Sequence, residues 1–221
     1  MHALSISTPD VPVPMPLPKR LFDIVVSGML LILFSPLVVL IVLCMIVEHV
    51  FSAANRGPVF YTETRMSQGK PFTLRKFRIF KRSAYEPIRG RGETVHTKAL
   101  ERDPNNLTAC GKVLKTFYLD EMPQLANVFC GDMSLVGPRP WNPVDYKNEI
   151  GRGEYRKKAI KAGLTGPVQI YKLNPHAHGG EHKLDHDYIQ FVKTKNGLRV
   201  LAHDIKILAK SLWFMLRGQG L

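Results

Sequence analysis

The longest hydrophobic stretch of the chain covers residues 24–47 and reads IVVSGMLLILFSPLVVLIVLCMIV, without a charged residue. A helix that crosses a membrane needs about 20 such residues, so the stretch predicts a membrane helix. Ser35 and Pro36 stand at its midpoint. Because proline lacks a backbone N–H and clashes with the carbonyl four residues earlier, here that of Ile32, we expect a kink. The freed backbone groups need partners in lipid, and the Ser35 hydroxyl is a candidate.

Basic residues flank this stretch on both sides. Lys19 and Arg20 precede it, and a series of Lys and Arg follows between residues 56 and 82. Positive residues mark the cytoplasmic side, so the pattern favours a re-entrant helix–break–helix hairpin over residues 19–50 that returns both ends to one face. A kinked ordinary span is the alternative. A signal peptide is a third interpretation, but the hydrophobic stretch is too long for a typical one.

Three charged residues mark the start of the hydrophobic helix. Lys19 and Arg20 suit lipid phosphates, and an acid such as Asp23 suits a helix N-terminus. A solvated helix start explains the same residues as well. Upstream, residues 1–18 include the Pro-rich segment TPDVPVPMPLP and are expected to be disordered.

Short strand-like and helix-like patterns alternate after the anchor. Residues 57–61 (GPVFY) and 72–78 (FTLRKFR), with a turn at 69–71, predict a β-hairpin with a basic face. Residues 107–117 predict a helix capped by Thr108, and residues 163–170 a tight turn that enters a strand.

Hydrophobic residues recur at helical spacing through residues 198–216, which predicts an amphipathic helix ending in Trp213 and Phe214. This helix either lies in the membrane interface or packs on the soluble part. The patterns together predict an α+β fold: a re-entrant membrane hairpin, then a mostly helical cytoplasmic catalytic domain over residues 51–221, with a short β-hairpin and interfacial helices.

The net charge of the chain limits the classes of partner that we expect. The 221 residues carry a net charge of +13, which favours nucleic acid, an acidic membrane surface or phosphorylated ligands. No helix-turn-helix, zinc-finger or aromatic-rich RNA signature accompanies the charge, so nucleic acid is not expected. The three cysteines form no CxxC pair, which fits a reduced, cytosol-facing location.

Candidate chemistry lies in residues 118–140, YLDEMPQLANVFCGDMSLVGPRP. Asp120 and Glu121 are adjacent carboxylates before a proline, and Arg139 stands in a Gly-Pro-Arg-Pro turn. A carboxylate can be a nucleophile or a metal ligand, and an Arg fork suits phosphate. Capping of the next helix by Asp120 is the competing interpretation of the acidic pair. The segment indicates chemistry on a phosphorylated substrate.

Four histidines fall within residues 175–187, PHAHGGEHKLDHD. They are a candidate metal site, and His182 and His186 would share one helix face. Gly179-Gly180 favours a mobile loop instead. Metal binding by the segment 176–186 is therefore one of two alternatives.

The ordered blocks KRLFD, GPVFY, GKPFTLRKFR, LDEMPQL, GDMSLVGPRP and AGLTGPVQI resemble the bacterial sugar transferases, or monotopic phosphoglycosyl transferases. The resemblance runs from about Lys19 to the C-terminus, is most specific over residues 119–140, and is closest to the small members of that family. It implies transfer of a sugar-1-phosphate from a nucleoside diphosphate sugar, expected to be a uridine derivative, to polyprenyl (undecaprenyl) phosphate. Such a step begins the assembly of exopolysaccharide, lipopolysaccharide or other glycoconjugates at the cytoplasmic face of the bacterial inner membrane.

The resemblance also implies roles for single residues. Asp120 would be the nucleophile that forms a phosphosugar intermediate, and Glu121 would hold Mg²⁺. Lys19, Arg20 and Asp23 would meet the lipid headgroups, and Ser35 and Pro36 would form the break in the anchor. The substrate- and phosphate-binding residues would be Arg139, Lys115, Pro138, Pro140, Thr165 and Gln169. Inner-membrane lipids would be partners, and the oligomeric state is left open between a monomer and a homodimer.

The chain departs from the family pattern at a few positions. Lys115 stands where an Arg is usual, and a Lys cannot replace a bidentate fork. Met66 replaces a usual glycine, and Pro167 replaces a usual Trp. The changes at Lys115 and Met66 motivate the alternative of a catalytically impaired membrane scaffold that binds lipid phosphate.

Overall fold

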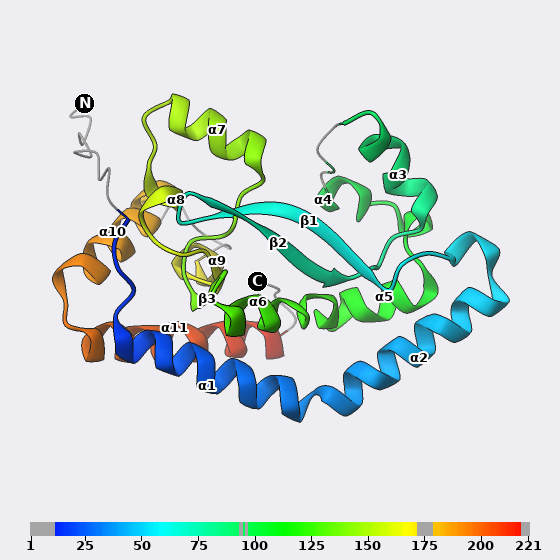
Figure 1. The fold of residues 1–221 in the computed structure, drawn as a ribbon, viewed down its shortest axis with the longest axis horizontal. Helices are drawn as coiled ribbons and strands as arrows, with labels where there is room; N and C mark the ends of the chain where they lie inside the picture. The colour runs from blue at the N-terminus through cyan, green and yellow to red at the C-terminus, as the bar shows by residue number, and fades with distance from the viewer. Residues whose placement is uncertain (1–11, 93–94, 96, 172–178, 218–221) are drawn as a thin grey trace. The chain divides into compact units, whose positions relative to one another are not determined.

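The computed structural model describes residues 12–92, 95, 97–171 and 179–217. Its residues fall into two compact units. The first comprises Met1–Val25, Thr64–Phe72 and Val128–Leu221, and the second Val26–Glu63 and Thr73–Asn127. The architecture is α+β and mostly helical, as predicted, with two small sheets (Figure 1). Disorder was expected for residues 1–18, of which residues 1–11 lie outside the described part. For the rest the expectation was wrong, because the first helix already begins at Leu17 and the Val13 N–H donates to the Ala159 carbonyl at 2.8 Å.

Two helices, α1 (Leu17–Leu33) and α2 (Ser35–Phe51), account for the hydrophobic stretch. Neither is by itself long and apolar enough to cross a membrane. As a pair bent by 54° they pass that test together, as a broken span or a re-entrant loop would (Figure 1). The break is where the sequence predicted it. The Ser35 hydroxyl donates to the Ile32 carbonyl at 2.8 Å, so it satisfies the group that Pro36 leaves without an N–H partner.

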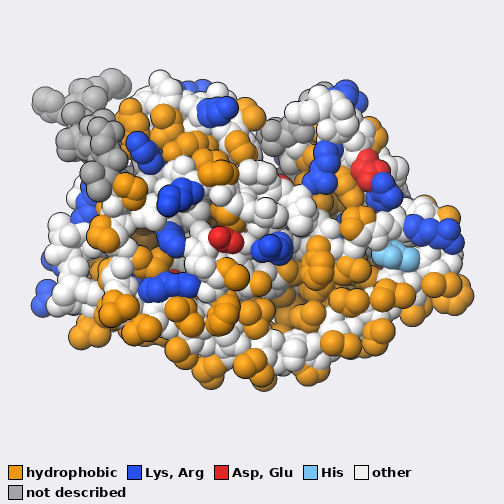
Figure 2. Space-filling view, in the orientation of Figure 1, with side chains coloured by type: hydrophobic (Ala, Val, Ile, Leu, Met, Phe, Trp, Pro, Cys, Tyr) orange, Lys and Arg blue, Asp and Glu red, His pale blue; other side chains and the backbone are white. Residues whose placement is uncertain are grey.

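The start of α1 has apolar side chains outside and two charged side chains inside. Leu17, Leu21 and Val25 are 52–68 % exposed, whereas Lys19 and Asp23 are 5 % and 1 % exposed. Further exposed apolar residues follow in both helices, and Figure 2 shows hydrophobic side chains along the outward sides of α1 and α2. Exposed apolar stretches of this kind mark surfaces that contact another protein or a membrane.

The second unit has a hydrophobic core that includes one side of α2. The buried members come from α2, the hairpin, the segment after it and helices of the same unit: Ile41, Met45, Tyr61, Phe77, Ile79, Phe80, Tyr85, Val95, Leu107 and Leu114. The helices include α3 (Arg82–Gly90), α4 (Thr97–Leu100) and α5 (Ala109–Thr116). The predicted cap of α5 is confirmed, because the Thr108 hydroxyl accepts from the Gly111 N–H at 2.9 Å.

The predicted hairpin is confirmed as β1 (Phe60–Ser67) and β2 (Lys70–Phe77). Its turn lies one residue earlier than expected. Gln68 and Gly69 both have positive φ, 51° and 76°, as the central residues of a type I′ turn require.

The first unit contains a parallel pair of strands, β3 (Ser134–Val136) and β4 (Gly163–Thr165), in which Ser134 pairs with Gly163 and Val136 with Thr165. Between the strands the chain forms α7 (Pro143–Gly151) and α8 (Arg156–Ala159). The helices α9 (Pro167–Ile170), α10 (Gly180–Thr194) and α11 (Gly197–Leu216) follow β4. The expectation that residues 163–170 form a turn entering a strand was wrong in order: the strand comes first and a short helix follows it.

Candidate active site

Asp120 lies in a short 3-10 turn, Leu119–Glu121, between α5 and α6 (Gln124–Cys130). Tyr118, the residue before the turn, has a left-handed backbone with φ 56°. A non-glycine residue rarely adopts this conformation, which costs free energy and is found preferentially at functional sites. The capping interpretation of Asp120 is not favoured, because α6 begins only at Gln124 and Asp120 lies inside the preceding turn.

The Asp120 carboxylate belongs to a residue that is only 8 % exposed. Burial and, to a smaller extent, the neighbouring Glu121 charge raise its pKa from 3.8 to about 6, while Lys76 opposes the shift. At neutral pH the group is therefore still mostly ionised, but it is poorly solvated. A carboxylate with such a perturbed pKa is a candidate for a chemical role.

Glu121 forms an ion pair with Lys76, whose Nζ lies 2.9 Å from Glu121 Oε1. Lys76 comes from β2, and both side chains are partly buried. The sequence patterns placed Lys76 only among the basic flanking residues. The basic face predicted for residues 72–78 was the one signal that could have pointed to it.

Lys115 is turned toward Glu101. Its Nζ donates to the Glu101 carbonyl at 3.0 Å and lies 3.5 Å from Glu101 Oε2. The Glu101 charge also contributes to the raised pKa of Asp120. Lys115 thus partly neutralises Glu101, whose charge raises the pKa of Asp120. The phosphate contact expected for Lys115 stays a prediction.

An apolar cavity of about 210 Å³ lies in the same unit as Asp120. Met122 and Pro123, which directly follow Glu121, form part of its wall, and Phe34 and Val38 contribute from the break between α1 and α2. Arg75 is the charged residue of the lining. The complete lining is Leu30, Leu31, Phe34, Val38, Phe60, Arg75, Phe77, Met122, Pro123, Leu125 and Ala126.

The Gly-Pro-Arg-Pro turn follows β3 in the first unit. It is fixed to β4 by two backbone bonds of 2.9 Å, from the Gly137 N–H to the Thr165 carbonyl and from the Gly163 N–H to the Pro138 carbonyl. A Cβ at Gly137 or Gly163 would collide with the facing backbone, so glycine is required at both positions.

Arg139 is exposed between the buried Pro138 and Pro140. Its guanidinium has no hydrogen bond or ion pair with any residue that the structure describes. A rigid turn that presents an uncommitted guanidinium suits an anionic ligand. Asp120 and Arg139 belong to different units.

Thr165 and Gln169, the two remaining residues predicted to bind substrate, differ in their hydrogen bonding. Thr165 is buried, and its hydroxyl lies 2.7 Å from that of Ser211. Because Ser211 donates to the Ile207 carbonyl, Thr165 is the donor of this pair. Gln169 is 7 % exposed, and neither its Oε1 nor its Nε2 has a hydrogen-bond partner in the described part of the chain. Such an unsatisfied buried amide is uncommon.

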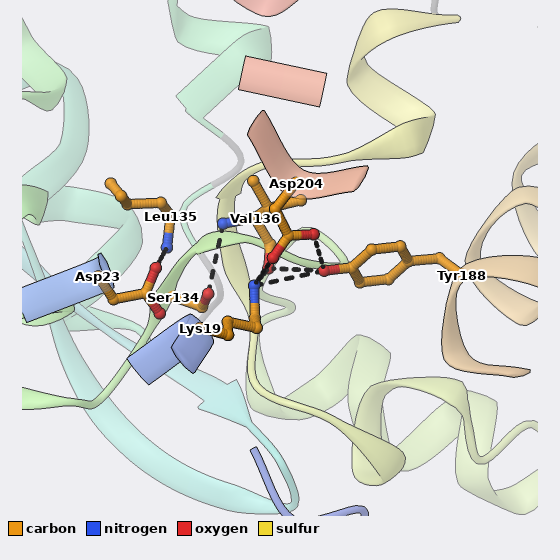
Figure 3. A network of polar contacts seen from close by, with 7 residues as sticks. All are labelled: Lys19, Asp23, Ser134, Leu135, Val136, Tyr188 and Asp204. Atoms are coloured by element: carbon orange, nitrogen blue, oxygen red, sulfur yellow. Dashed lines mark hydrogen bonds and ion pairs between the residues drawn. The ribbon is translucent and has the colours of Figure 1, made fainter. Parts of the chain in front are cut away.

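Charged residues at the start of α1 point into the first unit (Figure 3). Lys19 Nζ contacts Asp204 Oδ2 at 2.5 Å and the Val136 carbonyl at 2.9 Å. Asp23 Oδ1 accepts from the Leu135 N–H at 3.1 Å. Arg20, not drawn there, donates to two backbone carbonyls near the end of α6, those of Val128 and Phe129. The headgroup role expected for Lys19, Arg20 and Asp23 stays a prediction.

Carboxylates could hold a metal at two places in the described ranges. Asp120 and Glu121 supply oxygen ligands, which Mg²⁺ prefers, and Mg²⁺ commonly binds one or two carboxylates together with substrate phosphates. Glu149, Glu154 and His182 also place ligand atoms within 4.8 Å of one another. Of the His-rich segment, His182 and His186 lie in α10, whereas residues 172–178 lie outside the described part.

The sequence is similar to known proteins along most of its length. The bacterial sugar transferase family model matches residues 15–218. An undecaprenyl-phosphate galactose phosphotransferase of Salmonella typhimurium is 34 % identical over 216 residues, which cover 91 % of this chain and 41 % of the relative. A UDP-glucose:undecaprenyl-phosphate glucose-1-phosphate transferase of Escherichia coli is 36 % identical over 155 residues, or 69 % of this chain and 30 % of the relative. The exopolysaccharide production protein ExoY of Rhizobium meliloti is 33 % identical over 186 residues, which cover 78 % of this chain and 76 % of the relative. The chain thus spans less than half the length of the first two relatives.

Proposed function

The chain belongs to the bacterial sugar transferase family, and we propose that it transfers a sugar-1-phosphate from a uridine diphosphate sugar to undecaprenyl phosphate at the cytoplasmic face of the inner membrane. The observation that carries the proposal is the buried, partly desolvated Asp120 beside the Lys76–Glu121 ion pair, in the same unit as an apolar cavity. The names of the relatives support the acceptor.

Asp120 acts as the nucleophile. One of its carboxylate oxygens attacks the phosphorus that carries the sugar, and the bond from this phosphorus to the bridging oxygen breaks. Uridine monophosphate leaves with that oxygen and its electron pair. An oxygen of undecaprenyl phosphate then attacks the same phosphorus, which releases the lipid-linked sugar diphosphate and restores the carboxylate.

The basic side chains make this exchange feasible. Lys76, in the same unit as Asp120, offsets negative charge that the phosphorylated substrates bring, and Arg139 offers a guanidinium to a phosphate from the other unit. Glu121 would hold Mg²⁺, which supplies further charge neutralisation at the diphosphate when it is bound. The apolar cavity accommodates the first isoprene units of the acceptor. Arg75, which lines the cavity, binds the acceptor phosphate.

A membrane location is supported by the surface of the helices. The outward apolar sides of α1 and α2 lie in the inner leaflet, and the bend returns the chain to the face where it entered. In α11, the apolar residues Leu198, Ile205, Leu212 and Trp213 are exposed. This stripe favours the interfacial alternative for that helix.

The test is uridine monophosphate release by purified protein in nanodiscs with undecaprenyl phosphate and a panel of uridine diphosphate sugars. Wild type should release the nucleotide, and Asp120→Asn should not. Intact-protein mass spectrometry without acceptor should detect a phosphosugar adduct that Asp120→Asn lacks. Full activity of Asp120→Asn would refute the mechanism, and inactivity of wild type with every donor would favour the scaffold alternative.

A further inference from the structure

The face of α1 that carries Lys19 and Asp23 is buried, although both residues stand at the entrance to the hydrophobic anchor. They are four residues apart and therefore lie on one side of the helix. Leu17, Leu21 and Val25 are exposed instead. The helix therefore offers apolar side chains to the surroundings and charged side chains to the protein.

The Lys19 ammonium has an acceptor for each of its three protons. Its Nζ lies 2.5 Å from Asp204 Oδ2, 2.9 Å from the Val136 carbonyl and 3.3 Å from the Tyr188 hydroxyl (Figure 3). Tyr188 in turn donates to Asp204 Oδ1 at 2.7 Å. An ammonium with this complete set of acceptors has no donor left for a lipid phosphate.

Two contacts from α1 end on β3. Lys19 binds the Val136 carbonyl, and Asp23 binds the Leu135 N–H. Val136 is followed directly by Gly137, the first residue of the turn that presents Arg139. The side chains of α1 thereby hold the strand at the point where the turn begins.

A buried ion pair such as Lys19–Asp204 is a poor source of stability, because desolvation of both charges offsets most of their attraction. An apolar pair of similar volume would often stabilise a fold at least as well. The hydrogen bond that Lys19 donates to the Val136 carbonyl is what an apolar pair could not supply.

We infer that Lys19, held by Asp204 and Tyr188, is a positioning residue that fixes the Val136 carbonyl and so the orientation in which the turn presents Arg139 to a phosphorylated ligand. The inference rests on the proposed function for the role of Arg139. In this assignment Lys19 acts inside the protein and does not contact lipid headgroups.

The test uses the double variant Lys19→Met/Asp204→Leu, which removes both members of the ion pair together, so that neither is left buried without the other. Lys206→Met/Asp187→Leu is the matched control, because it removes one cation and one acid from exposed positions of α11 and α10. All proteins are studied in nanodiscs. Donor and acceptor KM, membrane partition and amide hydrogen exchange of residues 134–140 are measured.

The double variant should remain folded and membrane-bound, with faster exchange at residues 134–140. Its donor KM should rise about tenfold or more, as expected for a misplaced binding group, with little change in acceptor KM. The control should resemble wild type. Wild-type exchange or a wild-type donor KM in the double variant would overturn the inference, as would a loss of activity explained by release from the membrane. If wild type itself has no transferase activity, the proposed function fails, while the exchange measurement still decides whether Lys19 holds the turn.

Discussion

Lys76 Nζ and Glu121 Oε1 are 2.9 Å apart, which places a cation of β2 beside the acidic pair. The same lysine lowers the pKa of Asp120 against the larger effect of burial. Lys76→Met should therefore raise the pKa of Asp120 above about 6 and move the acid limb of the kcat/KM profile to higher pH. Lys76→Arg, which keeps the charge, is the control. An acid limb at the same pH in wild type and Lys76→Met would contradict this assignment.

Asp120 should reduce stability at neutral pH. Its pKa is raised on folding, so its contribution to stability is fully present below about pH 4 and is lost as the pH rises through about 6. The rise of the pKa from 3.8 to about 6 corresponds to at most about 3 kcal/mol. Asp120→Asn should thus unfold at a higher temperature than wild type at about pH 8, and at a similar temperature below about pH 4. Thermal unfolding across this range tests the expectation, and a difference that does not vary with pH would contradict it.

Gln169 should also lower the stability of the fold while it contributes to activity. Its buried carboxamide lacks partners in the described structure, and replacing an unsatisfied polar group by an apolar one of similar size is neutral or stabilising. Gln169→Leu is expected to raise Tm and to lower kcat/KM for the donor. Val168→Leu, at the preceding and less buried position, is the control. A Gln169→Leu enzyme with unchanged donor kinetics would identify the residue as a packing group only.

The bend at Ser35 and Pro36 predicts that both ends of the helix pair lie on the same side of the membrane. In a cysteine-free background, Pro14→Cys and Ala54→Cys place exposed thiols just outside the two ends of the helix pair. Both should react with an impermeant reagent from the cytoplasmic side only. Pro36→Ala restores the missing N–H donor and should favour a straighter helix. Labelling of the two ends from opposite sides in the parent protein would mean an ordinary span.

Local patterns predicted local structure well. The break at Pro36, the Thr108 cap and the hairpin each depend on residues a few positions apart. Pairings between distant residues were not predictable in this way. The contact of Lys76 with Glu121 joins residues 45 positions apart, and that of Lys19 with Asp204 joins residues 185 apart. The order of elements in residues 163–170 was wrong for the same reason, because β4 is a strand only through its pairing with β3.

The burial of charged side chains at the start of α1 bears on how a water-soluble form of this protein could be made. Deleting the anchor from its first residue would remove Lys19 and Asp23, leaving Asp204 as a buried acid without its cation and the Leu135 N–H without its acceptor. Truncated protein is therefore expected to misfold rather than to dissolve. A soluble variant would have to keep these two residues and carry polar substitutions at the exposed apolar positions of both α1 and α2 instead.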